Sequence, residues 1–117
     1  MVLTPYQTDF LLLKIKERIG LPLLGDKAEK KFFERVIERI LEKLVDVYPL
    51  HQLEFIHSDL IGLTYRNKKE LEEAIDLAVS KMKNEISLTL LSKEKEEEVF
   101  FIVIELILKA MQKNHKL

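Results

Sequence analysis

The chain has no cysteine and only three glycines and three prolines among its 117 residues. Without cysteine it can form no disulfide, no thiolate metal site and no thiol nucleophile. So few glycines and prolines argue against a disordered or linker-rich protein. Its 19 Lys and Arg nearly balance its 20 Asp and Glu. No overall charge of either sign therefore attracts nucleic acid or an anionic membrane.

A long hydrophobic run is also missing. The most apolar segment, Val99 to Met111, is interrupted by two charges and is shorter than the roughly 20 residues of a bilayer span. The N-terminus lacks the basic region and the small-residue cleavage site of a signal peptide. We therefore expect a cytoplasmic protein with no membrane partner. Its length predicts a single domain, 1–117, that needs neither metal nor disulfide to support its core.

The stretch from Ser92 to Lys113 has the strongest pattern in the sequence. Ser92 can cap a helix with its hydroxyl, and four glutamates follow at the positive end of the helix dipole. Only Glu105 and Lys109 interrupt the apolar residues from Val99 to Met111. A helix that is apolar around most of its circumference must be covered by other helices or by another subunit. We therefore expect this helix to lie at the centre of the fold.

Start and stop signals delimit the other helices. Thr4-Pro5 and Asn67 are helix starts, Gly20 is a terminator, and Pro49 discourages continuation of the preceding helix. The sequence predicts an all-α protein, a compact antiparallel bundle of four long helices plus one short helix. The predicted ranges are Pro5 to Ile19, Asp26 to Tyr48, Pro49 to Ile61 (the short helix), Lys68 to Ile86, and Lys93 to Lys113.

Apolar residues at three- and four-residue spacing predict the face that each helix buries. In the first helix we assign Tyr6, Phe10, Leu13, Ile15 and Ile19 to that face, widened by Leu11 and Leu12. The second helix buries Phe32, Phe33, Val36, Ile37, Ile40, Leu41, Leu44 and Val45. The short helix buries Leu50, Leu53, Ile56 and Leu60. The fourth buries Leu71, Ala74, Ile75, Ala78, Met82 and Ile86.

His51, Glu54 and His57 are the candidate metal ligands, with Asp59 close by. On a helix the two histidines would point about 120° apart, whereas a zinc-binding pair stands at i and i+4 on one face. Glu54-x-x-His57 has the spacing of di-iron bundles, but those bundles need a second copy of the motif. Gly-rich phosphate loops and nucleophile elbows are also missing. We therefore predict no metal, no cofactor and no enzymatic activity.

The segment from Tyr65 to Lys69 is the one basic patch that carries an aromatic residue. Tyr65, Arg66, Lys68 and Lys69 could meet phosphate at a helix start. Three glutamates follow within four residues, and a capped helix start explains the same residues. Nucleic-acid binding is therefore a secondary hypothesis.

Two apolar sets are candidate contact surfaces. On the last helix Glu105 falls within about 60° of Glu98, Lys109 and Gln112, so it belongs to a polar stripe and can pair with Lys109. Phe101 and Ile102 flank that stripe, as the apolar groups of a subunit contact would. Leu21, Leu23 and Leu24 make the connection after Gly20 unusually apolar, either to plug the core or to contact a partner.

No family resemblance emerges, and three functional hypotheses follow. The first is a protein-interaction module, an adaptor, chaperone-like or assembly subunit, that forms a homodimer. The second is a small nucleic-acid-associated regulator that uses the Tyr65–Lys69 patch. The third is a metal protein or enzyme around His51, Glu54 and His57. We prefer the first, because the sequence offers surplus apolar surface but no catalytic motif.

Overall fold

The structure, a computed structural model, describes residues 3–20, 24–58, 60–112 and 117. Within these residues no β-strand forms, and the predicted all-α bundle of four long helices and a short one is confirmed. The elements are α1 (Pro5–Arg18), α2 (Asp26–Leu44), α3 (Leu50–Leu53), the 3₁₀ helix η1 (Glu54–His57), α4 (Lys68–Glu85) and α5 (Lys93–Ala110).

Three predicted caps fix where the helices start. The Thr4 hydroxyl accepts the Gln7 N–H at 3.2 Å, and the Gln7 side chain accepts the Thr4 N–H at 2.9 Å. This reciprocal pair satisfies two of the amides that a helix start leaves without a partner. Asn67 and Ser92 cap α4 and α5 by a single hydrogen bond each, in which the side-chain oxygen accepts the amide three residues on.

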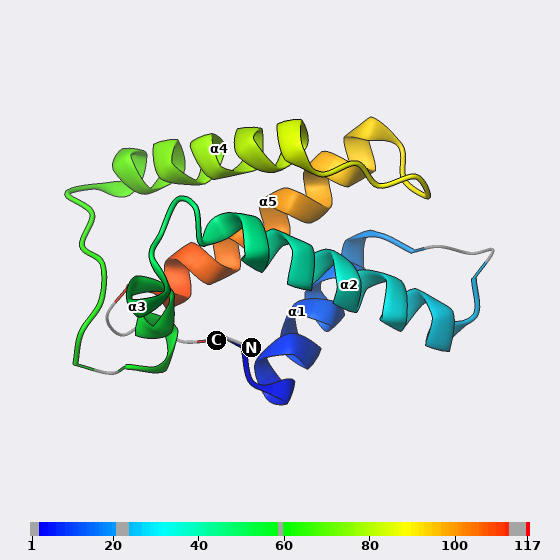
Figure 1. Cartoon of the computed structure of the whole chain (residues 1–117), viewed down its shortest axis with the longest axis horizontal. Coiled ribbons are helices and arrows are strands. Elements are labelled where there is room, and N and C mark those ends of the chain that lie inside the picture. The colour runs from blue at the N-terminus through cyan, green and yellow to red at the C-terminus, as the bar shows by residue number, and fades with distance from the viewer. Residues whose placement is uncertain (1–2, 21–23, 59, 113–116) are drawn as a thin grey trace.

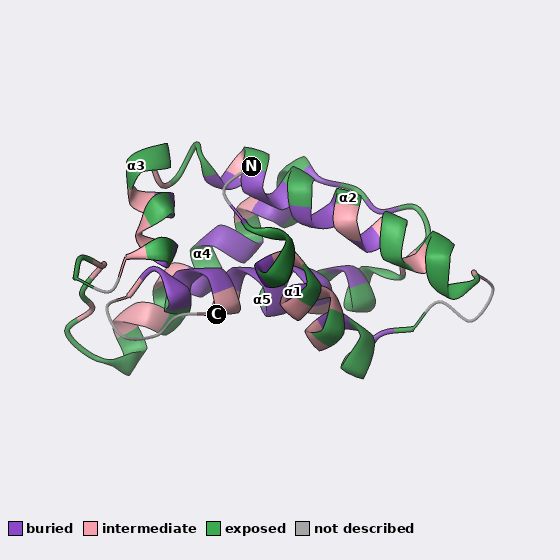
Figure 2. Cartoon of the chain, turned by 90° about the horizontal axis from the view of Figure 1, so that it is seen from below, coloured by how far each residue is buried: buried purple, intermediate pink, exposed green. Residues whose placement is uncertain are grey.

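α5 lies at the centre of the bundle, as predicted. It contacts α1, α2, α4 and η1, and α4 runs back along it in the opposite direction (Figure 1). Its buried positions, shown in purple in Figure 2, are Glu96, Val99, Phe100, Ile102, Val103, Ile104, Ile107, Leu108 and Ala110. Within the described part of the chain, no helix is both long and apolar enough to cross a membrane.

A buried carboxylate joins α5 to the connection that precedes it. Glu96 is only 3% exposed, and its Oε2 accepts the Leu88 N–H at 2.8 Å. Leu88 is itself buried, so this bond supplies the partner that its amide would otherwise lack. From sequence, Glu96 was one of several glutamates in the first helical turn, and nothing distinguished it from its neighbours.

The short helix differs most from its prediction. The expected element, Pro49 to Ile61, is one α-helical turn followed by η1, which ends at His57. The Ser58 hydroxyl then accepts the amides of Leu60 and Ile61, at 3.2 and 3.1 Å, and stabilises a turn. Leu53 and Ile56 are buried as predicted, but Leu50 and Leu60 are exposed.

α1 buries only part of the face predicted for it. Leu11, Ile15 and Ile19 are fully or almost fully buried and follow one another at four-residue spacing. Tyr6 and Leu13, which the prediction placed in the core, are 72% and 55% exposed. α1 packs against α2 and α5 but makes no contact with α4 (Figure 1). The side of α1 that faces away from the bundle, toward the viewer in Figure 2, is therefore left uncovered by the other described helices.

The remaining helix ends shift by a few residues. α2 stops at Leu44 rather than Tyr48, and Val45, predicted to be buried, is exposed in the turn that follows. α5 stops at Ala110, beyond which Met111 accepts the Leu63 N–H at 2.9 Å. That bond links the end of α5 to the connection before α4.

Replacing Ile104 or Leu108 with Ala should lower the free energy of unfolding by about 2–5 kcal/mol, as large-to-small changes in a packed core do. Both side chains are fully buried on α5. Urea unfolding followed by circular dichroism measures the change. Leu77→Ala on the exposed side of α4 is the matched control and should cost far less. A loss below about 1 kcal/mol at both core positions would contradict the central place of α5.

Replacing Glu96 with Ala should cost about 1–3 kcal/mol, because a buried amide loses its acceptor. Glu96→Gln should cost less, since the side-chain amide keeps an oxygen that can accept the Leu88 N–H. Urea unfolding of the two variants beside Glu97→Ala, an exposed neighbour on the same helix, tests this order. An equal decrease in the free energy of unfolding for Glu96→Ala and Glu97→Ala would show that the buried Glu96 carboxylate has no special role in stability.

Candidate functional site

A groove between α1 and α5, here called the α1/α5 groove, contains the residues predicted as a contact surface. It holds about 230 Å³. α1 contributes Lys14, Glu17 and Arg18, and α5 contributes Phe101, Ile102, Glu105 and Leu106. Phe101 is 36% exposed, whereas Ile102 is only 6% exposed. The sequence placed both residues on flanks of the exposed stripe, so that placement is wrong for Ile102, which packs mainly into the core.

Charges of both signs surround this apolar floor. Glu105 lies 3.4 Å from Lys109, which confirms the pair expected from their spacing. Lys14 lies 3.8 Å from Glu17, and its ammonium stands 5.4 Å from the centre of the Phe10 ring. Such exposed contacts are individually weak. A second molecule can therefore displace them at little cost.

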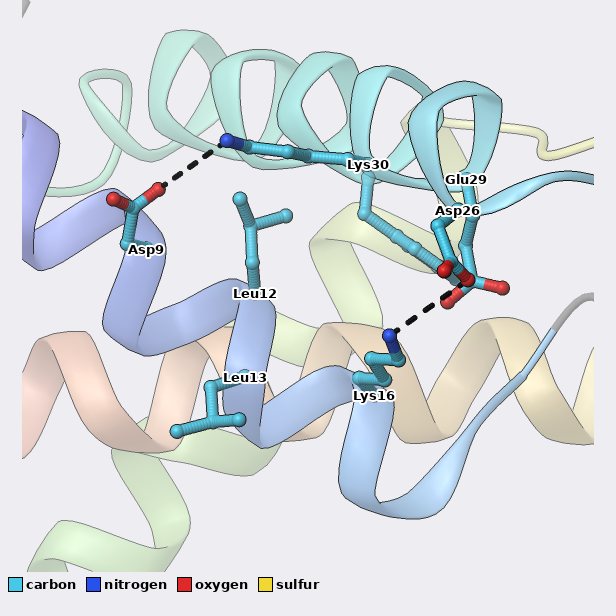
Figure 3. A pocket seen from close by; sticks show the side chains of 8 residues that line it. Asp9, Leu12, Leu13, Lys16, Asp26, Glu29 and Lys30 are labelled. Carbon is cyan, nitrogen blue, oxygen red and sulfur yellow. Dashed lines mark ion pairs between the residues drawn. The ribbon is translucent and has the colours of Figure 1, made fainter.

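A second groove, the α1/α2 groove, lies on the other side of α1 (Figure 3). It holds about 300 Å³, with Leu12, Leu13 and Phe33 as its apolar lining. Two ion pairs bridge the helices, Lys30 to Asp9 and Lys16 to Asp26, each at 3.9 Å. Leu12 lies between these two pairs in Figure 3. Because the earlier α1 residue pairs with the later α2 residue, α1 and α2 run antiparallel.

Between the grooves, one side of α1 carries a row of residues that we call the α1 stripe: Tyr6, Leu13 and Glu17, which are exposed, and Phe10, which is half-buried. Steps of four, three and four residues keep them within about 60° of one another on a helix. Leu11 and Ile15, on the core side, point roughly the opposite way. Sequence reasoning found these apolar residues but assigned them to the core, because both faces of α1 satisfy helical spacing.

A third depression lies away from α1, beside the end of α2. Val47 and Leu77 supply its exposed apolar residues, and it holds about 410 Å³. Lys81 lies 2.6 Å from Glu85, and their hydrogen bond lowers the pKa of the Glu85 carboxyl. The sequence analysis made no prediction for Leu77, which is exposed.

The predicted nucleic-acid patch is largely accounted for by its own helix start. Arg66 is on the surface, but its Nε donates to Glu70 Oε2 at 2.9 Å. That hydrogen bond raises the pKa of Arg66. Lys68 and Lys69 are exposed in the first turn of α4. Of the three predicted cationic residues, Arg66 is therefore paired with an acid, and the positive charge of the patch is reduced.

Tyr65 turns partly inward instead of outward. Its hydroxyl is buried and makes no hydrogen bond of ordinary distance and angle, although Tyr48 lies beside it. Burial first, and the neighbouring Tyr48 second, raise the pKa of Tyr65 above its ordinary value. A ring packed in this way is a poor platform for stacking a base.

The three candidate metal ligands do not come together. His51, Glu54 and His57 are all exposed, and the change from α3 to η1 at Glu54 alters the angle expected between the histidines. Across the described residues, no group of three or more His, Asp or Glu side chains is placed to hold a metal ion.

Of the leucines predicted after Gly20, Leu24 is half-buried. Leu21 and Leu23 lie outside the described residues. A contact role for this connection therefore stays a prediction.

Comparison with known proteins finds no matching family model, no matching curated protein and no matching solved structure.

Tyr65→Phe should change the free energy of unfolding by less than about 1 kcal/mol at pH 7, because the hydroxyl has no hydrogen bond of ordinary distance and angle to lose. A raised folded-state pKa contributes stability that is fully present below the unfolded value, about 10, and is lost as the pH rises above it. Tyr65→Phe should therefore lose less stability between pH 7 and pH 11 than the unchanged protein. Urea unfolding at both pH values, with Tyr6→Phe at an exposed tyrosine as control, measures the difference. An unchanged pH dependence would contradict this.

Proposed function

We propose that this protein is an interaction module, an adaptor, chaperone-like or assembly subunit, that self-associates through the α1 stripe and the adjoining α1/α5 groove. The observation that carries the proposal is the outer side of α1. Tyr6 and Leu13 are more than half exposed there, on one face of a helix whose opposite face is fully packed.

The grouping of these residues matters more than their number. Single exposed apolar side chains are normal on soluble proteins, whereas contiguous apolar patches mark contact sites. Tyr6, Phe10 and Leu13 are neighbours on one helix face. Glu17 continues that row into the α1/α5 groove, where Phe101 adds a second exposed aromatic group. Exposed apolar groups thus lie on both helices, with the charged residues of the α1/α5 groove between them.

The charges around the patch favour a second copy as the partner. In a two-fold contact the same patch lies on both sides, so a charged patch is self-complementary when it carries both signs of charge. The α1/α5 groove has Lys14 and Arg18 beside Glu17 and Glu105. A partner of one charge sign would meet repulsion from half of these groups.

The apolar side chains supply the driving force. Each large apolar residue that passes fully from water into an interface contributes about 1.5–3 kcal/mol. A two-fold contact counts each residue twice. Association entropy offsets much of this sum, so we expect a dimer of moderate affinity, not a permanent one.

Phe101→Glu should convert a dimer into a monomer, because it places a charge without a partner in the contact. We expect the unchanged protein to sediment as a dimer at tens of micromolar, and the variant to sediment as a monomer under the same conditions. Analytical ultracentrifugation measures both.

Leu77→Glu is the matched control, because Leu77 is an exposed apolar residue on α4, which does not contact α1. This variant should remain a dimer, and circular dichroism should show that both variants stay folded. A monomeric unchanged protein at tens of micromolar would contradict self-association. Loss of the dimer in both variants would contradict the assignment of the dimer contact to the surface around Phe101.

A further inference from the structure

The spacing of the α1 stripe matches the contact row of a two-helix coiled coil. Its residues follow one another at alternating steps of four, three and four residues, as the a and d positions of a heptad do, and this alternation keeps a row facing a second helix. The core side of α1 has a different spacing, because Leu11, Ile15 and Ile19 are each four residues apart. The helix thus carries two contact rows, and only one has a partner inside the chain.

Charged residues flank the α1 stripe on the side of α2. Asp9 precedes Phe10, and Lys16 precedes Glu17, so one flank carries an acid and a base seven residues apart. Both are exposed and reach across the α1/α2 groove to single partners at 3.9 Å. Flanking positions of this kind select the partner and the orientation in coiled coils.

We infer that, within the self-association proposed above, two copies pack α1 against α1 in antiparallel orientation. Phe10 then faces Leu13 of the partner subunit, and Tyr6 faces Glu17 of the partner subunit. A two-fold axis across the pair keeps equivalent flanks on the same side. Asp9 therefore meets Lys16 of the partner subunit, and the symmetry makes this pair twice.

A parallel pairing would be worse on two counts. It would set Glu17 against Glu17 of the partner subunit, so that two carboxylates face each other in the contact row. It would also align the two helix dipoles, whereas the antiparallel arrangement opposes them. The antiparallel arrangement leaves no like charges facing each other along the row.

The charges outside the row fit the same arrangement. Each Asp9 already lies near Lys30, and each Lys16 lies near Asp26. Contact between Asp9 and Lys16 of the partner subunit joins these pairs into an alternating chain of four charges. Such a network is favourable where an isolated surface pair contributes little.

The same geometry explains the place of Phe101. Glu17 lines the α1/α5 groove, so the facing tyrosine, Tyr6 of the partner subunit, lies at the entrance to that groove. The ring would meet Phe101 and the cationic groups of Lys14 and Arg18, which attract an aromatic face. One contact thus accounts for the stripe, its charged flank and the groove.

Charge reversal tests this pairing directly. Asp9→Lys should raise the dimer dissociation constant at least tenfold, because two lysines then face each other at two equivalent places. Lys16→Asp should do the same with two aspartates. An equimolar mixture of the two variants should regain a dimer of nearly the original affinity, because both flanking contacts in the mixed pair become Lys with Asp. Sedimentation equilibrium of each variant and of the mixture gives the three constants.

Asp76→Lys and Lys69→Asp, at exposed positions of α4, are the matched controls and should leave the dimer unchanged. Circular dichroism checks that every variant is folded. A mixture no tighter than its components would overturn the antiparallel pairing. A dimer that survives both α1 reversals but is lost in Phe101→Glu would overturn the α1 contact and keep self-association. A monomeric unchanged protein would overturn both proposals.

Discussion

The burial of α5 is the constraint on which the rest of this structure depends. Its apolar residues occupy most of the helix circumference, so it cannot be stable in water unless neighbours cover it from several directions. α1, α2, α4 and η1 all contact it. Since α1 and α4 both pack on α5 without touching each other, each has a side that faces away from the rest of the fold. Tyr6, Leu13 and Leu77 are the exposed large apolar residues of those two helices, and others, such as Leu60 and Leu90, lie in the connections.

Most of the architecture could be predicted from the sequence because its strongest signals are local. The caps at Thr4, Asn67 and Ser92 each involve residues only three positions apart, so a few letters determine them. The buried face of α2 could be read because its other side is densely charged. The polar stripe of α5 could be placed because Glu105 and Lys109 stand one turn apart.

What could not be predicted depends on tertiary packing. α1 has apolar residues on both faces, and only the position of α5 decides that Leu11 and Ile15, not Tyr6 and Leu13, enter the core. Glu96 cannot be told from its neighbours until the connection before α5 brings the Leu88 amide to it. Leu60 fits a helical stripe, but the Ser58 turn ends the helix before it is reached. Helical periodicity marks apolar rows without saying which neighbour covers each one.

The error at α1 bears most directly on function. Tyr6 and Leu13, predicted to be buried, face outward instead. Their exposed apolar surface is explained neither by the stability of the bundle nor by the pairing of its helices. If the only role of α1 were to cover α5, polar residues at positions 6 and 13 would serve equally well and would keep the surface soluble. Tyr6 and Leu13 instead expose apolar area next to two grooves and a flank with both signs of charge. Each feature alone is ordinary on a small protein, but their coincidence on one helix face favours a contact surface.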